Sequence, residues 1–145
     1  MSATSHALNT VVATAIPQNQ RLMQYPKYFG PLMLKTEATI LSFAATISDF
    51  YLRNGTGYWD MYSLSNGGFY MAPRVKSGHK LHVVWSGNYF EADMSSDAFG
   101  IVVCLFSYNL IWESTQNDRF ASLYHNLKDF SCTHKESSLI LRAID

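Results

Sequence analysis

The spacing of apolar side chains changes twice along this chain, from the period of a helix to that of a strand and back. The first clear helical period is carried by Ile40, Phe43, Ala44, Ile47 and Tyr51. These positions fall on one face of a helix, so each can pack against the same core. We therefore predict a helix that follows residue 36 and ends in the glycine-rich loop at residues 54–57.

Two segments precede this helix. Residues 1–15 are small and polar without a helical period, and we expect them to form a flexible N-terminal arm. Ile16-Pro17 predicts the start of a short helix, because proline fits a first helical turn, and Pro26 with Gly30-Pro31 predicts its end. Residues 16–145 are then expected to form one domain, since this length suits a single core.

The middle of the chain alternates between polar residues and aromatic or apolar ones, which predicts strands. The predicted strands cover residues 58–64, 69–72, 81–85 and 89–94. Asn66, Gly67 and Gly68 form the corner between the first two, because Asn-Gly favours the left-handed backbone of a tight hairpin. Gly87 and Asn88 form the corner between the last two. These five residues are therefore predicted to have structural roles in turns.

The last third of the chain returns to the helical period. Ser95 or Ser96 can cap a helix that runs to about Trp112, with Asp97 favourably placed at the positive end of its dipole. The apolar run at residues 99–112 is too short to span a bilayer. We expect a buried helix here and no contact with a membrane.

Two further helices are predicted after it. The first covers about residues 117–130, and the second begins at Thr133-x-x-Glu136, the pattern of a capping box. Helices on both sides of an antiparallel run indicate an α+β fold. We predict a single domain in which four to five helices pack on an antiparallel meander of about four strands.

The charge balance disfavours two ways of acting on DNA. Eleven Lys and Arg residues offset eleven Asp and Glu residues, so the formal net charge is zero. Tight nonspecific binding to DNA needs a basic surface, and imitation of DNA needs a dense acidic field. Neither mechanism fits a neutral chain in which only 15% of the residues are charged.

The two cysteines indicate a reducing compartment. Cys104 lies among apolar residues and Cys132 in another predicted helix, which favours free thiols over a disulfide. Ala13-Thr14-Ala15 has the form of a signal-peptide cleavage site, but no positively charged stretch precedes it. We therefore expect a cytoplasmic protein.

The candidate chemical groups do not form a catalytic pattern. His79 and His82 are the only closely spaced histidines, and residues three apart on a strand point to opposite faces. Glu91 and Asp93 should share a strand face, but a solvated surface explains them as well as an acid/base pair. We expect no catalytic residue, no metal and no cofactor.

The basic segment at residues 74–80 is the best local candidate for contact with nucleic acid. Arg74, Lys76 and Lys80 could reach two or three phosphates, with Tyr70 or Tyr89 available for stacking. A solvated loop is the competing interpretation, because the chain as a whole is neutral. A weak DNA contact is therefore kept as an alternative.

Several sequence blocks, in order and at similar spacing, resemble the ArdB/KlcA antirestriction family, with the closer likeness to its ArdB members. These blocks are residues 58–59 (YW), 64–73 (LSNGGFYMAP), 87–91 (GNYFE), 96–101 (SDAFGI), 124–129 (YHNLKD) and 142–145 (RAID). The resemblance covers residues 16–145. It implies a non-enzymatic protein that protects incoming plasmid or other mobile DNA from type I restriction systems, with loss of cleavage but not of methylation.

The resemblance leaves the partner and the site open. Candidate residues for partner contact are Trp59, Asp60, Tyr70, Tyr89, Phe90, Glu91, Asp93 and Asp97. For at least half of the four aromatic candidates, burial in the core is the favoured interpretation. The first hypothesis is an inhibitor that acts on the type I restriction-modification complex, directly or through DNA or a host protein. The second is a DNA-binding module that blocks translocation of the enzyme through its basic hairpin loop. The sequence leaves the oligomeric state undetermined.

Overall fold

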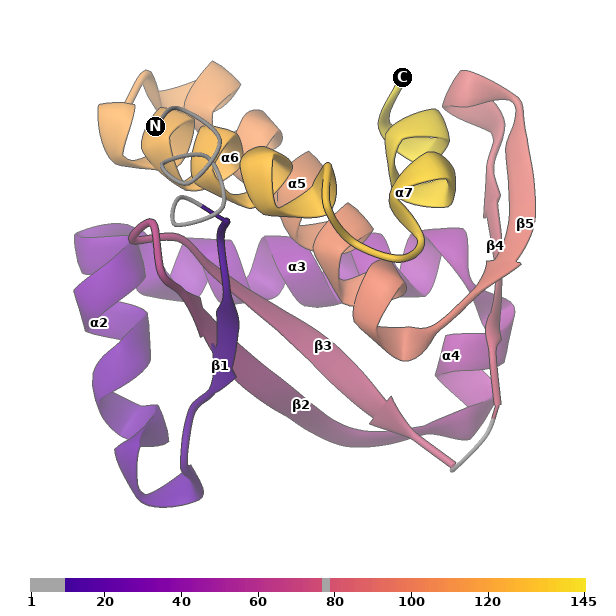
Figure 1. Cartoon of the computed structure of the whole chain (residues 1–145), viewed down its shortest axis with the longest axis horizontal. Helices are drawn as coiled ribbons and strands as arrows, with labels where there is room; N and C mark the ends of the chain where they lie inside the picture. The colour runs from indigo at the N-terminus through magenta and orange to yellow at the C-terminus, as the bar shows by residue number, and fades with distance from the viewer. Residues whose placement is uncertain (1–9, 77–78) are drawn as a thin grey trace, which may run out of the picture.

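The computed structural model describes residues 10–76 and 79–145 and combines helices with two antiparallel sheets (Figure 1). The larger sheet has the strand order β1-β2-β3, formed by Ala13–Ala15, Gly55–Leu64 and Phe69–Val75. The smaller sheet pairs β4, Leu81–Trp85, with β5, Phe90–Met94. The predicted α+β fold is confirmed. The predicted continuous meander is wrong, because its two hairpins belong to different sheets.

The N-terminal helices differ from the prediction at their ends. They are η1 Gln18–Met23, α2 Gln24–Phe29, η2 Gly30–Leu32, α3 Met33–Ile47 and α4 Asp49–Asn54. Pro26 does not end a helix, because it lies in the first turn of α2, where proline is tolerated. Tyr51 does not continue α3, because Ser48 is extended and its hydroxyl accepts the Tyr51 N–H as the cap of α4. Gly55–Gly57 belong to β2 and not to a loop.

The C-terminal helices are α5 Ser96–Thr115, α6 Asp118–Ser131 and α7 Ser137–Ile144. Ser95 caps α5 as predicted, since its hydroxyl accepts the Ala98 N–H. The predicted capping box at Thr133 and Glu136 is wrong. Glu136 instead accepts hydrogen bonds from the backbone N–H and the hydroxyl of Ser95, which ties the start of α7 to the start of α5.

The core is built around α5. This helix is long and apolar enough to cross a membrane by length and composition alone, but 61% of its 18-residue apolar stretch is buried inside the protein. Strand β3 and helices α3, α6 and α7 surround it, so the predicted buried helix is confirmed (Figure 1). Several of its side chains are completely enclosed, among them Phe99, Val103, Leu105 and Tyr108.

Helix α5 also closes the free edge of β3. Residues Phe69, Met71 and Pro73 are two apart, so their carbonyl groups point to the same edge of the strand. The Tyr108 hydroxyl donates to Phe69 O at 2.6 Å, and the Cys104 thiol lies 3.7 Å from Met71 O. The Ser96 hydroxyl donates to Pro73 O. A fourth strand cannot pair here, which explains why β4 starts a second sheet.

The Cys104 thiol that contacts the β3 edge remains protonated. Burial raises the pKa of Cys104 to about 12, so the group acts as a neutral donor toward the strand. Cys132 follows α6 and is exposed, and both cysteines are free.

The predicted N-terminal arm lies partly outside the described residues, which begin at residue 10. Of the residues 1–15 that were predicted to form the arm, Ala13–Ala15 form β1 and pair with Tyr62–Leu64. The backbone N–H of Val12 also donates to the Ser65 hydroxyl at 2.8 Å. The ordered fold therefore starts before residue 16.

Gly100 allows the close approach of α5 to β3, and we predict that Gly100→Ala destabilises the protein. A Cβ atom there would lie 2.4 Å from Met71 O and 2.6 Å from the Ala72 Cα. Alanine usually stabilises a helix interior relative to glycine by about 1 kcal/mol. At position 100 the contact with β3 reverses this effect, so the substitution should lower the stability. We expect a loss of at least about 2 kcal/mol in urea unfolding.

Asn109→Ala on the exposed face of the same helix is the matched control, with an expected change within about 0.5 kcal/mol. An unchanged or higher stability of Gly100→Ala would mean that α5 does not approach β3 this closely.

Candidate functional site

Only one of the four aromatic candidates is exposed to solvent. Trp59, Tyr70 and Phe90 are 4%, 1% and 4% exposed and belong to the core. Tyr89 is 97% exposed. The expected aromatic contact surface is therefore reduced to Tyr89, because β2, β3 and β5 turn the other three rings inward.

Tyr89 stands at the tip of the β4–β5 hairpin on a well-supported corner. Its φ of 52° is uncommon for a bulky residue. The corner beneath it includes η3, Ser86–Asn88. A Cβ on Gly87 would meet the Trp85 ring at 2.8 Å, and the Asn88 amide donates to Ala143 O of α7 at 2.6 Å. The hairpin tip is thus held from two sides while the Tyr89 ring projects into solvent.

The outer face of the same hairpin carries an ionic cluster. Glu91 and Asp93 share a strand face, as predicted, and His82 on β4 lies beside both. The His82 ring nitrogens are 2.7 Å from Asp93 and 2.9 Å from Glu91. These hydrogen bonds, with Asp93 first, raise the pKa of His82 above its ordinary value. His82 therefore serves as a counter-ion to carboxylates.

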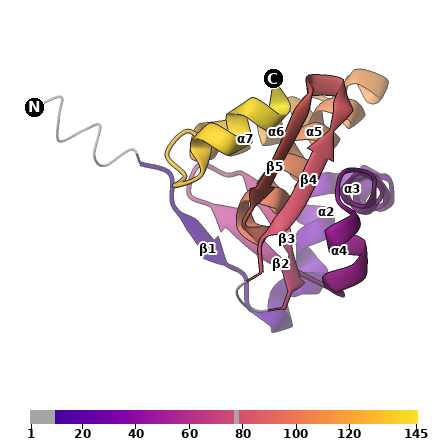
Figure 2. The ribbon, with the colours of Figure 1, turned by 90° about the vertical axis from the view of Figure 1, so that its right-hand side faces the viewer.

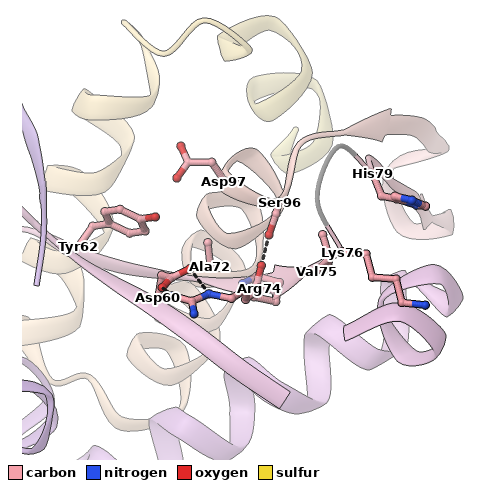
Figure 3. Close-up of a pocket in the computed structure, with 10 residues that line it drawn as sticks. Asp60, Tyr62, Ala72, Arg74, Val75, Lys76, His79, Ser96 and Asp97 are labelled. Carbon is pink, nitrogen blue, oxygen red and sulfur yellow. Dashed lines mark hydrogen bonds and ion pairs between the residues drawn. The ribbon is translucent and has the colours of Figure 1, made fainter. Parts of the chain in front are cut away.

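A groove of about 260 Å³ lies over the end of β3 and the start of α5 (Figure 3). Its charged and polar lining residues are Asp60, Tyr62, Arg74, Lys76, His79, Ser96 and Asp97. Tyr62, Asp97 and the Asp60–Arg74 pair lie toward one side of the groove, and Lys76 with His79 lies toward the other (Figure 3). The groove carries both signs of charge and does not form a uniform basic or acidic site.

The three basic candidates do not form one phosphate-binding patch. Arg74 lies in β3 and is paired with Asp60 at 2.5 Å. That hydrogen bond raises the pKa of the already cationic Arg74. Lys80 lies close enough to Glu136 to help lower the pKa of that carboxyl. Lys76 remains exposed beside the groove.

A fourth basic residue joins Arg74 from a distant part of the chain. The guanidinium carbons of Arg21 and Arg74 lie 4.5 Å and 4.4 Å from the centre of the Tyr58 ring. Arg21 belongs to η1, and no spacing in the sequence connects it with β3. Sequence reasoning missed it because only the folded chain brings η1 against β2.

Asp97 is part of a mostly buried hydrogen-bond network. It accepts from the Tyr70 hydroxyl at 2.7 Å and from His134 Nε2 at 2.8 Å. The Glu136 N–H donates to His134 Nδ1 at 2.9 Å, which places the single ring proton on Nε2. Burial and this hydrogen bond to Asp97 both raise the pKa of Tyr70.

This network resembles part of a hydrolase triad but lacks its geometry. A triad histidine needs one ring nitrogen facing a nucleophilic hydroxyl. Both nitrogens of His134 are already engaged, and the Ser95 and Ser96 hydroxyls donate to Glu136 and Pro73. The network instead joins β3, α5 and the loop before α7.

Glu136 completes this connection. Burial raises the pKa of its carboxyl, but the hydrogen bonds from Ser95, with smaller contributions from the nearby His134 and Lys80 side chains, outweigh that effect and lower it. The carboxylate therefore stays ionised at neutral pH, as an acceptor for Ser95 requires.

The residues predicted to form turns lie at the two hairpin corners. Gly67 has a φ of 90°, which favours glycine, and the Asn66 side chain accepts the Gly68 N–H at 3.0 Å. The Asn66 amide also donates to Asn126 O of α6 at 2.9 Å. This corner therefore also attaches the β2–β3 hairpin to α6.

Comparisons with known proteins agree with this fold and with one family. A family model described as antirestriction protein matches residues 53–145. Two Escherichia coli proteins named antirestriction protein KlcA are 38% and 39% identical over 142 and 140 residues. Each alignment covers 93% of this chain, with 94% and 95% of the relatives. The uncharacterized protein YfjX of E. coli K12 is 36% identical over 134 residues, covering 91% of this chain and 86% of its own length.

A solved structure shares the architecture as well. It matches with a TM-score of 0.81 at 38% identity and covers 93% of this chain and 95% of the other. It comes from work on KlcA and ArdB, which describes a novel fold and antirestriction activity against type I DNA restriction systems in vivo but not in vitro. The named relatives are KlcA proteins, so the comparisons support the joint family and not the expected closer likeness to ArdB.

The His82 cluster gives a prediction about pH. Because the pKa of His82 is raised in the folded state, its ion pairs are fully present below the ordinary histidine pKa. They are lost as the pH rises through the folded value. An NMR titration of the His82 ring should therefore give a midpoint above that of a free histidine, and Asp93→Asn should lower it.

Asp118→Asn, on helix α6, is the control and should leave the midpoint of His82 unchanged. An Asp93→Asn variant with the wild-type midpoint would show that the ion pair does not form in solution.

Proposed function

We propose that this chain, which belongs to the antirestriction family of KlcA and ArdB, protects incoming plasmid or other mobile DNA from type I restriction systems. The observation that carries the proposal is the match along 93% of the chain to KlcA proteins and to a solved structure of the same fold. The protein is a non-enzymatic inhibitor that acts in the bacterial cytoplasm. It blocks translocation or cleavage and leaves methylation largely intact.

The mechanism is not imitation of DNA. A DNA mimic presents a dense acidic field to the enzyme's DNA-binding surface, but the net charge of this chain is zero. In the groove and on the hairpin, acidic groups are paired with Arg74 and His82. Inhibition must then use a contact surface other than a charge replica of the double helix.

The β4–β5 hairpin is the surface that best fits such a contact. Tyrosine is enriched among the residues that dominate binding energy, because its ring buries a large area at low entropic cost. Tyr89 projects from a supported corner, with Glu91 and Asp93 on the adjacent strand. We assign these three residues to contact with a component of the restriction machinery.

The partner need not be the purified enzyme alone. The related KlcA and ArdB proteins are active against type I systems in vivo but not in vitro. This difference supports a requirement for a cellular state or host factor that purified components lack. A working restriction complex on its DNA, or a host protein bound to it, would supply that requirement.

A second candidate function is direct contact with DNA. The observation that favours it is the pair of guanidinium groups on Tyr58, with Lys76 nearby, which offers cations and an aromatic ring on one surface. The Asp60–Arg74 pair and the neutral chain limit the affinity that this surface can reach. The protein would then block translocation by occupying the duplex.

The leading proposal is tested by plating unmodified phage on cells with a type I system, with and without the protein, and scoring methylation of the progeny. We expect restored plating with methylation retained. Tyr89→Ala should reduce protection at least about fivefold, since truncating a central tyrosine typically costs more than about 1 kcal/mol of binding.

Leu22→Ala is the matched control, because Leu22 is 95% exposed and lies in η1, away from the hairpin. Its protection should equal that of the wild type. Unchanged plating in cells that express the wild-type protein would refute the antirestriction function itself. Full protection by Tyr89→Ala would refute only the assigned contact.

Salt dependence distinguishes the DNA-binding alternative. If the protein binds duplex DNA through Arg21, Arg74 and Lys76, affinity should fall steeply with salt, and the slope should decrease by about one for each cation replaced by glutamine. A fluorescence titration at several salt concentrations measures this. Lys35→Gln, on α3, is the control that should leave the slope unchanged.

A further inference from the structure

Helix α3 presents an apolar stripe to solvent. Its inward face is formed by Thr36, Ile40, Phe43, Ala44 and Ile47, which are buried. On the opposite side, Leu34, Ala38, Leu41 and Ala45 follow one another at intervals of four, three and four residues. This is the seam of a helix that pairs with another helix. Two large apolar side chains of this stripe are therefore exposed to solvent, Leu34 at 74% and Leu41 at 38%.

Two hollows, each lined by both polar and apolar side chains, lie beside α3. Leu110 of α5 and Val84 of β4 are each 45% exposed. Leu110 borders a hollow along one flank of α3, and Val84 borders a second one near its C-terminal end, with Thr46 lining both. Figure 2 shows α3 nearly end-on at the margin of the molecule, with no other described element outside it. Eight large apolar side chains are exposed among the described residues, and four of them lie on α3 or beside it. These four are Leu34, Leu41, Val84 and Leu110.

We propose that this face pairs with a second copy of the chain, α3 against α3 in antiparallel orientation. A two-fold axis between Ala38 and Leu41 would place Leu34 opposite Ala45 of the second copy, and Ala38 opposite Leu41 of the second copy. Every layer then joins a large side chain to a small one. A two-fold interface must be complementary to itself, and this order of leucine and alanine meets that condition.

The charges at the ends of α3 fit the same arrangement. Lys35 lies near the N-terminal end of the stripe, and Asp49 lies just beyond its C-terminal end, in a hollow that Arg53 and Val84 also line. Antiparallel pairing brings Lys35 of one copy toward Asp49 of the other, twice per dimer. It also opposes the two helix dipoles. A parallel pair would instead place like charges at the same end.

The size of the surface predicts a weak dimer. A stable interface buries about 800 Å² per partner. The 15 residues of α3 give a seam only about 22 Å long. Leu110 and Val84 widen the contact, but assembly should depend on concentration, with monomers present in dilute solution.

The first test is sedimentation velocity over a wide range of protein concentration. The wild type should shift from monomer to dimer, and Leu41→Glu should raise the dissociation constant at least about a hundredfold, because symmetry alters two positions at once. Leu22→Glu is the matched control, since it adds the same charge at a more exposed leucine outside α3. Circular dichroism checks that both variants stay folded.

The second test fixes the orientation by disulfide formation in a Cys132→Ser background. A mixture of Ala38→Cys and Leu41→Cys chains should link rapidly, because the antiparallel register places these residues opposite each other. A mixture of Leu34→Cys and Leu41→Cys is the control and should link slowly. Rapid linking of Leu34→Cys chains alone would indicate a parallel pair and contradict the proposal, because the antiparallel register separates the two copies of residue 34 by about 16 Å along the helix axis.

A wild-type chain that stays monomeric at its highest soluble concentration would overturn the proposal. So would a dimer that is unaffected by Leu41→Glu, since it would use a different face. A monomeric wild type in which Leu41→Glu abolishes protection would also overturn it and assign the α3 face to a different protein.

Discussion

The arrangement of the whole chain depends on the contact between α5 and the free edge of β3. Three consecutive outward carbonyls of the strand, those of Phe69, Met71 and Pro73, are each covered by a side chain of the helix. An open strand edge would accept another strand. Because α5 occupies this edge, β4 cannot extend the sheet and pairs with β5 instead. The same helix carries the largest part of the core, so topology and stability have one origin.

Because the strands divide into two sheets, the β4–β5 hairpin is separate from the β1–β2–β3 sheet. It is anchored by Trp85, which packs on Phe43 and Phe106, and by the bond from Asn88 to α7. Its outer face remains in solvent with Tyr89 and the His82 cluster. The mostly buried network of Asp97 and His134 joins β3, α5 and the loop before α7 and needs no catalytic explanation. A rigid support with an exposed aromatic tip suits a protein that acts by contact.

The parts predicted correctly from the sequence depend on local signals. The Asn66-Gly67 corner specifies its hairpin, and the cap at Ser95 with the apolar run after it specifies α5. The split of the sheet was not predictable in this way, because it follows from hydrogen bonds between residues far apart in the sequence. Glu136 shows the same limit, since its tertiary bond to Ser95 replaces the local cap that the pattern indicated.

The candidate site was only partly predictable for a related reason. Glu91 and Asp93 share a face because alternation along a strand is local, whereas their partner His82 comes from the neighbouring strand. Composition could not separate the exposed Tyr89 from the buried Trp59, Tyr70 and Phe90. Arg21 reaches Tyr58 only through the packing of η1 against β2, so no motif contains it.

The most direct measurement is photo-crosslinking in living cells with benzoylphenylalanine in place of Tyr89. If the hairpin contacts the restriction machinery, irradiation should yield an adduct with a subunit of the type I complex or a protein bound to it. That adduct should be absent from cells without the restriction system and from a chain labelled at Leu22. Protection without any protein adduct at position 89, or an adduct with DNA alone, would contradict a protein contact through this hairpin.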